Sequence, residues 1–213
     1  MRHLSPSRAR ARRRVQARGV SLIEILVTLI LVAVGLLGLV GLLVQSQRSQ
    51  FESYQRVQAL TLLDDMVSRI QANRGAARCY AVSAASGENF LGTGSPLADY
   101  QANASSTPAC AGASSQQAAT VLSDLRAWNA SLLGSGETTA GGDKAGAMLG
   151  ARGCIQTIAG APNTYQVSVV WQGVGDTSAP SGINCASTNA ASLFGSAARR
   201  RGVSATVQIA TLN

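Results

Sequence analysis

Histidine is almost absent from this sequence, and aromatic residues are few. The 213 residues include one histidine, His3, which stands before the first apolar run, and aromatic residues make up 4%. If the segment before that run is removed, no imidazole remains for a Ser/His or Cys/His nucleophile pair or for a mixed His/Cys zinc site. This excludes most common hydrolytic and zinc chemistries. At about 150 residues per domain, the length allows one domain with an extension, or two small domains.

Acidic residues are missing from the first 19 positions, which hold seven arginines. The whole chain has 18 Lys+Arg and 10 Asp+Glu, so the chain after Gly19 has 11 basic against 10 acidic side chains and is close to neutral. Positive charge placed just before a membrane segment fixes the cytoplasmic side of that segment. The basic excess therefore indicates membrane topology rather than nucleic-acid binding.

An apolar run of 25 residues, 20–44, follows, with Glu24 as its one charge and without proline. A helix of this length is about 37 Å long, enough to cross a hydrocarbon core of about 30 Å with some tilt. We expect a single-pass helix with the N-terminus in the cytoplasm and the bulk of the chain across the membrane. The run is too long for an ordinary signal-peptide core and no A-x-A pattern follows it, so we expect the helix to be retained.

Two features inside this run bear on function. A carboxylate deep in a spanning helix costs about 2.5–3.5 kcal/mol, so Glu24 is either functional or close enough to the interface to stay hydrated. Gly35, Gly38 and Gly41 recur every three residues. We favour close helix packing in the membrane as their role, with local loosening of the helix as the alternative.

The segment Arg18–Val27, RGVSLIEILV, resembles the class III signal of type IV pilins and type II secretion pseudopilins. The shared features are a basic leader, Gly19 as its last residue, an apolar stretch, and Glu24 as the fifth residue after the cut. The resemblance implies cleavage between Gly19 and Val20 by a prepilin peptidase, N-methylation of Val20, and a helix that becomes the filament core. Glu24 would pair with the N-terminal amine of a neighbouring subunit. Val20 departs from the pattern, since most members have Phe there.

Beyond residue 44 the sequence predicts one continuing helix and a compact head. Glycine and proline are absent between Val44 and Gly75, so we expect the helix to reach about Asn73. We divide the chain into a cleaved leader (1–19), a transmembrane half-helix (20–44), an amphipathic half-helix (45–73) and an exported head (74–213). Helical spacing places six apolar residues of the second half on one arc, which we expect to cover the head: Leu60, Leu62, Leu63, Met66, Val67 and Ile70. Phe51 and Tyr54 would contact either the head or other filament subunits.

The head is predicted to contain a short helix and three antiparallel strands. The helix covers 120–133, the strands cover 154–158, 165–172 and 203–210, and residues 81–119 form an irregular connection. The sheet has one apolar face, which the long helix would cover. The expected fold class is therefore α+β and type IV pilin-like: a long N-terminal helix packed on a small antiparallel sheet, with one extra helix. Asp124, Trp128, Leu132, the segment 165–171 and a late cysteine also resemble the PilV family of type IV pilus modification proteins, which are minor pilins.

Four cysteines lie on the exported side: Cys79, Cys110, Cys154 and Cys185. An even number of cysteines in an oxidising compartment predicts two disulfides, and the spacing offers no C-x-x-C motif for metal or redox chemistry. Three pairings are possible. We favour Cys79–Cys110 and Cys154–Cys185, because each closes a 31-residue step across a loop-rich stretch. No metal and no cofactor are expected.

Arg199, Arg200 and Arg201 form the remaining run of charge. We expect a solvated loop before a strand, with contact to an acidic neighbouring pilin as the alternative. Aromatic residues do not alternate with these arginines, so nucleic-acid binding is not indicated.

Together these features predict a non-enzymatic minor pilin of the bacterial inner membrane with a periplasmic head, which helps to initiate or cap a type IV pilus and can enter the pilus itself. Its expected partners are the prepilin peptidase, other minor pilins and the major pilin, and no small-molecule substrate is expected. A minor pseudopilin of type II secretion is the nearest alternative. An exported enzyme on a signal anchor is a third, but Asp64 and Asp65 face the polar arc of the helix and do not converge with other acids.

Overall fold

The computed structural model describes residues 19–95, 112–134, 140–141 and 148–210. The chain divides into two compact units, residues 1–47 and 48–213. One helix, α1 (Leu22–Ala72), supplies residues to both. Its end is within one residue of the position predicted from the absence of glycine and proline.

The described part of the first unit is the beginning of α1. The helix starts after Ser21, whose carbonyl accepts hydrogen bonds from the backbone N–H of Glu24 (3.0 Å) and Ile25 (3.2 Å). The large apolar side chains from Val20 to Val44 are all exposed, between 43% and 81%. The most apolar 18-residue window of α1 has a mean hydropathy of 2.9 and no buried residue, so this helix is a candidate membrane span.

The second unit is built on an antiparallel sheet. Within the described ranges the sheet has four strands in the order β1-β2-β3-β4. These are β1 (Leu91–Gly92), β2 (Arg152–Thr157), β3 (Thr164–Gln172) and β4 (Arg200–Gln208). The long pairings place Gly153 opposite Val169 and Val169 opposite Val203, so these three residues share one face of the sheet. The α+β class is as predicted.

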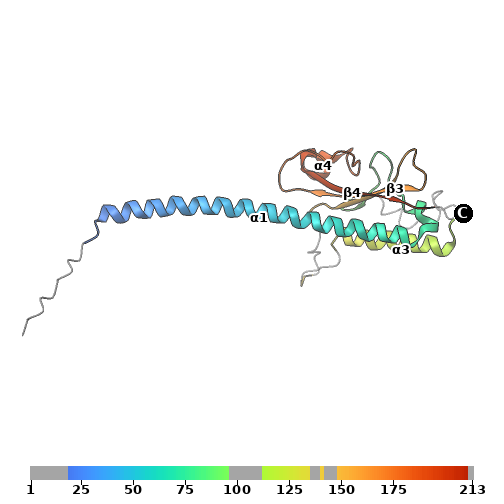
Figure 1. The fold of residues 1–213 in the computed structure, drawn as a ribbon, viewed down its shortest axis with the longest axis horizontal. Helices are drawn as coiled ribbons and strands as arrows, with labels where there is room; N and C mark the ends of the chain where they lie inside the picture. The colour runs from blue at the N-terminus through green and yellow to red at the C-terminus, as the bar shows by residue number, and fades with distance from the viewer. Residues whose placement is uncertain (1–18, 96–111, 135–139, 142–147, 211–213) are drawn as a thin grey trace, which may run out of the picture. The chain divides into compact units, whose positions relative to one another are not determined.

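The second half of α1 and the helix α3 (Ser115–Leu132) cover the face that carries Val169. Figure 1 shows α3 beside this part of α1, with β3 and β4 on the other side of α1. Trp128 of α3 is fully buried, and its indole N–H donates to the Leu62 carbonyl at 2.8 Å. The main buried side chains of this core come from all of these elements: Ala59, Leu63, Met66, Ile70, Leu125, Ile155, Val167 and Val203.

The buried stripe of α1 differs from the predicted one at its N-terminal end. Leu63, Met66 and Ile70 are buried as expected, but Leu60 is 42% exposed. Gln55 and Ala59 are buried instead. An assignment that counts only large apolar residues cannot find a stripe that continues through alanine and glutamine.

The opposite face of the sheet is also covered, which the expectation of a single apolar face missed. The segment between β3 and β4, which includes α4 (Ala190–Phe194) and the 3-10 helix η4 (Ala197–Arg199), supplies most of this cover. A second cluster of buried residues lies there: Phe90, Cys154, Val170, Ile183, Cys185, Ala186, Ala190 and Phe194. The sheet is therefore the middle of three layers.

Several predicted boundaries were wrong. Helix α3 begins five residues before Thr120, because Ser114 caps it: the Ser114 hydroxyl accepts from the Gln117 N–H at 3.2 Å, and the Gln117 side chain accepts from the Ser114 N–H at 2.9 Å. This capping box was readable from the sequence. Residues 81–119, expected to be irregular, also contain β1. The 3-10 helix η1 (Arg74–Tyr80) follows α1 directly.

Candidate functional site

The predicted cleavage site lies just before α1. Gly19 and Val20 are exposed and precede the helix, which begins at Leu22. A Cβ atom built on Gly19 would meet nothing within 4 Å. The peptide bond between Gly19 and Val20 is therefore not protected by secondary structure or by neighbouring side chains of the described chain.

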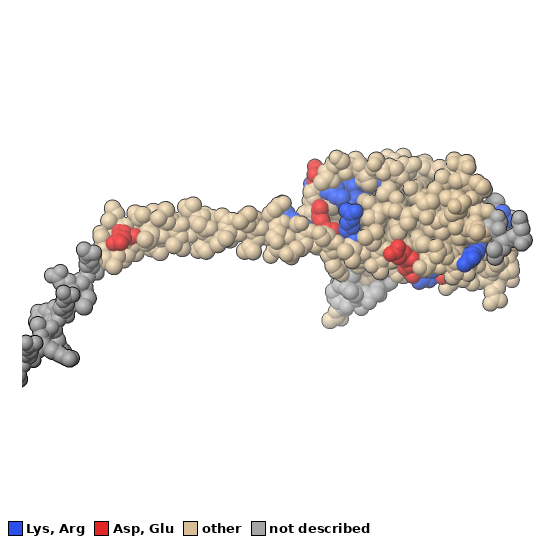
Figure 2. All heavy atoms as spheres, viewed as in Figure 1, with Lys and Arg blue, Asp and Glu red and all other residues tan. Residues whose placement is uncertain are grey.

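Glu24 lies in the first turn of α1 and is exposed. Unpaired backbone N–H groups give a helix N-terminus partial positive charge, which stabilises a carboxylate there. In Figure 2 the visible surface of this part of the helix is uncharged apart from one acidic patch near its N-terminal end, and Glu24 is the one charged residue of the apolar run. Gly35, Gly38 and Gly41 face open space, since a Cβ on each would meet nothing within 4 Å.

The cysteines confirm one predicted pairing. Cys154 of β2 and Cys185 form a disulfide with an S–S distance of 2.03 Å, and both residues are fully buried. Cys79 is buried in η1, with 1% of its surface exposed. Cys110 lies outside the described residues, so its pairing with Cys79 stays a prediction.

An ion-pair network joins α1, η1 and α3. Arg69 of α1 binds Asp65 through Nε at 3.0 Å and Asp124 of α3 through Nη1 at 2.8 Å. The hydroxyl of Tyr80 in η1 donates to the other oxygen of Asp124. The pKa of Tyr80 is raised by burial and, to a smaller extent, by this hydrogen bond. The pKa of Arg69 is raised mainly by the hydrogen bond that its guanidinium donates to Asp65. Asp65 therefore does converge with another acid, contrary to expectation, but Arg69 bridges the two carboxylates and gives them a structural role.

The arginine run is not a solvated loop, which corrects the sequence-based interpretation. Arg199 ends η4 and pairs with Asp176 on the surface, at 2.9 Å. Arg200 and Arg201 begin β4 and point to opposite faces of the sheet. Arg200 is 5% exposed, and its Nη1 donates to the carbonyls of Ile183 (2.8 Å) and Cys185 (3.1 Å). Runs of charged residues are usually exposed, and for this reason we predicted a loop where β4 already begins.

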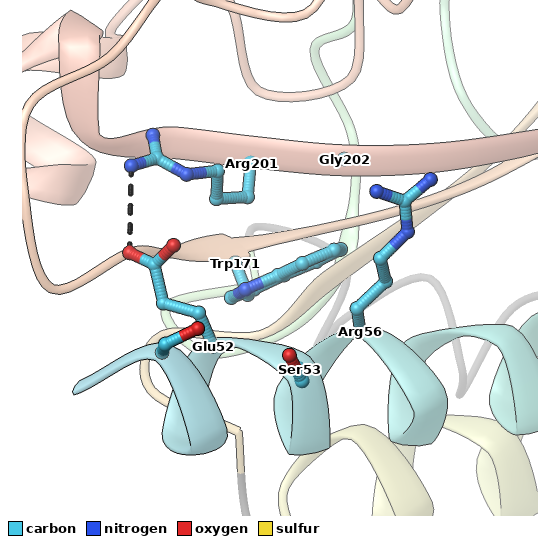
Figure 3. A pocket seen from close by; sticks show the side chains of 7 residues that line it. Glu52, Ser53, Arg56, Trp171, Arg201 and Gly202 are labelled. Atoms are coloured by element: carbon cyan, nitrogen blue, oxygen red, sulfur yellow. Dashed lines mark ion pairs between the residues drawn. The ribbon is translucent and has the colours of Figure 1, made fainter. Parts of the chain in front are cut away.

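Arg201 borders a cavity of about 320 Å³ in the second unit. The lining comes from one side of α1 and from the ends of β3 and β4: Ser49, Glu52, Ser53, Arg56, Trp171, Arg201 and Gly202. Figure 3 shows the Trp171 ring between Arg56 and the Glu52–Arg201 ion pair. The sequence did not reveal this site, although Glu52 and Arg56 are four residues apart and so lie on one helix face.

Phe51 and Tyr54 flank this region of α1 without entering the core. They are 47% and 59% exposed, so neither is buried against the head. Over the described ranges, no group of three or more His, Cys, Asp or Glu side chains is placed to hold a metal ion. The chain was also compared with models of protein families, with curated proteins and with solved structures, and it matches none of them.

Proposed function

We propose that this chain is a minor pilin, a non-enzymatic subunit that is processed at Gly19, held in the inner membrane by α1, and assembled with other pilins. The observation that carries the proposal is the N-terminal segment. It joins a basic leader, Gly19 at the leader's end, and Glu24 in the first turn of a helix whose large apolar side chains are all exposed as far as Val44. An exposed apolar surface of this length requires lipid or other helices around it.

The physical chemistry of cleavage supports an assembly role for Glu24. Removal of the leader would create an α-amine at Val20. A cation within reach of Glu24 in another subunit lowers the cost of burying both charges and fixes the register of the two helices. The resemblance to class III signals implies the same pairing.

The first test is processing at Gly19. Protein extracted from membranes should lack residues 1–19 and carry a methylated Val20, as measured by intact mass and peptide mapping. Gly19→Leu should accumulate the precursor, because a bulky side chain blocks access to the scissile bond. Gly19→Ala, which keeps a small side chain, is the matched control and should be processed. An intact leader in cells with active peptidase would refute the proposal.

The second test separates assembly from processing. Glu24→Gln keeps the size and hydrogen-bonding capacity of the side chain but removes its charge, so the variant should be cleaved and inserted normally. Recovery of partner pilins and the number of surface filaments should fall, whereas Glu88→Gln, the same change on the exposed surface of the head, should leave both unchanged. Wild-type recovery and piliation with Glu24→Gln would rule out the ion-pair mechanism. Co-purified pseudopilins instead of pilins would assign the chain to type II secretion.

A further inference from the structure

The cavity beside Arg201 is rich in hydrogen-bond donors. Arg56 and Arg201 bring two guanidinium groups to it, and Ser49 and Ser53 bring hydroxyls. Trp171 is 4% exposed, and its indole nitrogen is buried with no hydrogen-bond partner in the described part of the chain. Because this nitrogen is itself buried, Trp171 can report changes at this wall of the cavity, while the guanidinium and hydroxyl groups of the lining supply the donors for a ligand.

Arg201 is held rigidly at one end of the cavity. Its guanidinium donates to the carbonyls of Ala198 (2.9 Å) and Gly175 (2.6 Å) and lies 3.6 Å from the Glu52 carboxylate. A Cβ on Gly173 would lie 2.8 Å from the guanidinium carbon, so a larger residue there would displace this end of the Arg201 side chain. Glu52 also accepts from the Val174 N–H at 3.2 Å. Glu52 is thus already engaged, and its charge is offset by Arg201.

Arg56 lies at the other end, and its charge is not offset. Its side chain is exposed, and within the described ranges it has no ion-pair partner. The lining therefore carries two positive charges and one negative charge. This excess is local, because the chain after Gly19 is close to neutral.

We infer that this cavity binds an acidic side chain, Asp or Glu, presented by another exported subunit. The inference rests on the proposed function for the source of that side chain. A guanidinium forms short, charge-assisted hydrogen bonds with a carboxylate, and Arg56 has these donors available. The volume of about 320 Å³ is at the small end of ligand pockets, which fits one side chain and its neighbours better than a cofactor.

The two tryptophans allow a direct test on the full chain in detergent micelles. With ¹⁵N-labelled tryptophan, the protein gives two indole N–H signals, one from Trp171 in the cavity wall and one from Trp128, which is bonded to Leu62 and serves as an internal control. The probe is acetyl-Gly-Glu-Gly-amide, and its neutral counterpart is acetyl-Gly-Gln-Gly-amide. The Glu peptide should shift the Trp171 signal saturably, and the Gln peptide should not.

Variants connect this binding to Arg56. Arg56→Gln should weaken binding of the Glu peptide by about tenfold, because a charge-assisted hydrogen bond is lost. Arg48→Gln makes the same charge change on α1 outside the cavity and should leave binding unchanged. In cells, Arg56→Glu should reduce recovery of partner pilins and Arg48→Glu should not. If the Arg56→Glu variant still recovers partner pilins, the acidic group does not come from another subunit.

Three results would overturn the carboxylate assignment. They are an unmoved Trp171 signal, equal shifts with both peptides, and a lower half-saturating concentration for inorganic phosphate, which would indicate a phosphate or headgroup site. Because the peptide titration does not depend on leader cleavage, its failure leaves the minor-pilin proposal intact. Conversely, if the leader is never cleaved but the chain binds the Glu peptide, the carboxylate site is supported. The proposal that a pilin subunit supplies the carboxylate would then be wrong.

Discussion

Among single residues, the three consecutive arginines show how position in a sheet determines the role of a charge. Arg199 is on the surface, Arg200 is buried on one face of the sheet, and Arg201 lies at the cavity on the other face. Arg152 is buried like Arg200, with its guanidinium over the rings of Phe90 (5.3 Å) and Phe194 (4.6 Å). Burial lowers the pKa of both buried arginines. Neither has a carboxylate partner in the described ranges, so carbonyls and aromatic faces replace ion pairs in this layer.

Gly153 is a position where added side-chain volume should be costly. It lies in β2 under α3, and a Cβ there would be 2.9 Å from Cδ1 of Leu132 and closer still to the Trp128 ring. Gly153→Ala should therefore lower the free energy of unfolding by about 1–3 kcal/mol, the usual range for overpacking. Gly175→Ala, where a Cβ meets nothing within 4 Å, is the control. Urea unfolding followed by tryptophan fluorescence would measure both, and equal stability of the two variants would contradict the packing described here.

For secondary-structure elements, regular periodicity explains what the sequence could predict. The long helix, β3 and most of β4 have apolar residues at helical or alternating spacing, and each was found close to its predicted place. Strand β1 has two residues and α4 has five, too few for any period to show. The cover of the second sheet face depends on contacts distant in sequence, such as Cys154 with Cys185, and its local composition resembles a loop. The same limit applies to the cavity, which needs α1, β3 and β4 together.

The network of Arg69, Asp124 and Tyr80 predicts a dependence of stability on alkaline pH. The pKa of Tyr80 is raised in the folded state by burial and by its bond to Asp124. The folded state thus holds a proton that the unfolded state loses above about pH 10. The stability contributed by Tyr80 is complete below pH 10 and is lost as pH rises toward the folded-state pKa. Burial raises the pKa of Tyr165 in the same direction.

Tyr80→Phe should therefore reduce the fall in unfolding free energy above pH 10, while Tyr165 maintains part of it. Tyr54→Phe is a suitable control, since Tyr54 is 59% exposed. Denaturant unfolding at several pH values between 8 and 11 would measure the slopes. If Tyr80→Phe and wild type lose stability equally above pH 10, the raised pKa of Tyr80 makes no contribution.

For the whole molecule, the two units need different surroundings to be stable. The described part of the first unit exposes all its large apolar side chains, which need lipid or helical partners. The second unit has a core on each face of the sheet, and the disulfide Cys154–Cys185 lies in one of them. By the chain-entropy estimate, a disulfide closing a loop of this size contributes about 3–4 kcal/mol. An oxidising compartment is therefore important for the second unit, as the exported topology predicts.

This separation predicts that residues 48–213 fold without the apolar first part of α1. The buried residues of α1 are Gln55, Ala59, Leu63, Met66 and Ile70, and all belong to the second unit. A fragment starting at Arg48 and exported to the periplasm should stay soluble without detergent, since it lacks the exposed apolar run. It should contain the Cys154–Cys185 disulfide by peptide mapping and should unfold cooperatively, while the full chain should require detergent. A fragment that sediments with membranes, or that is soluble but shows no cooperative transition, would mean that the apolar half of α1 contributes to the folding of the head.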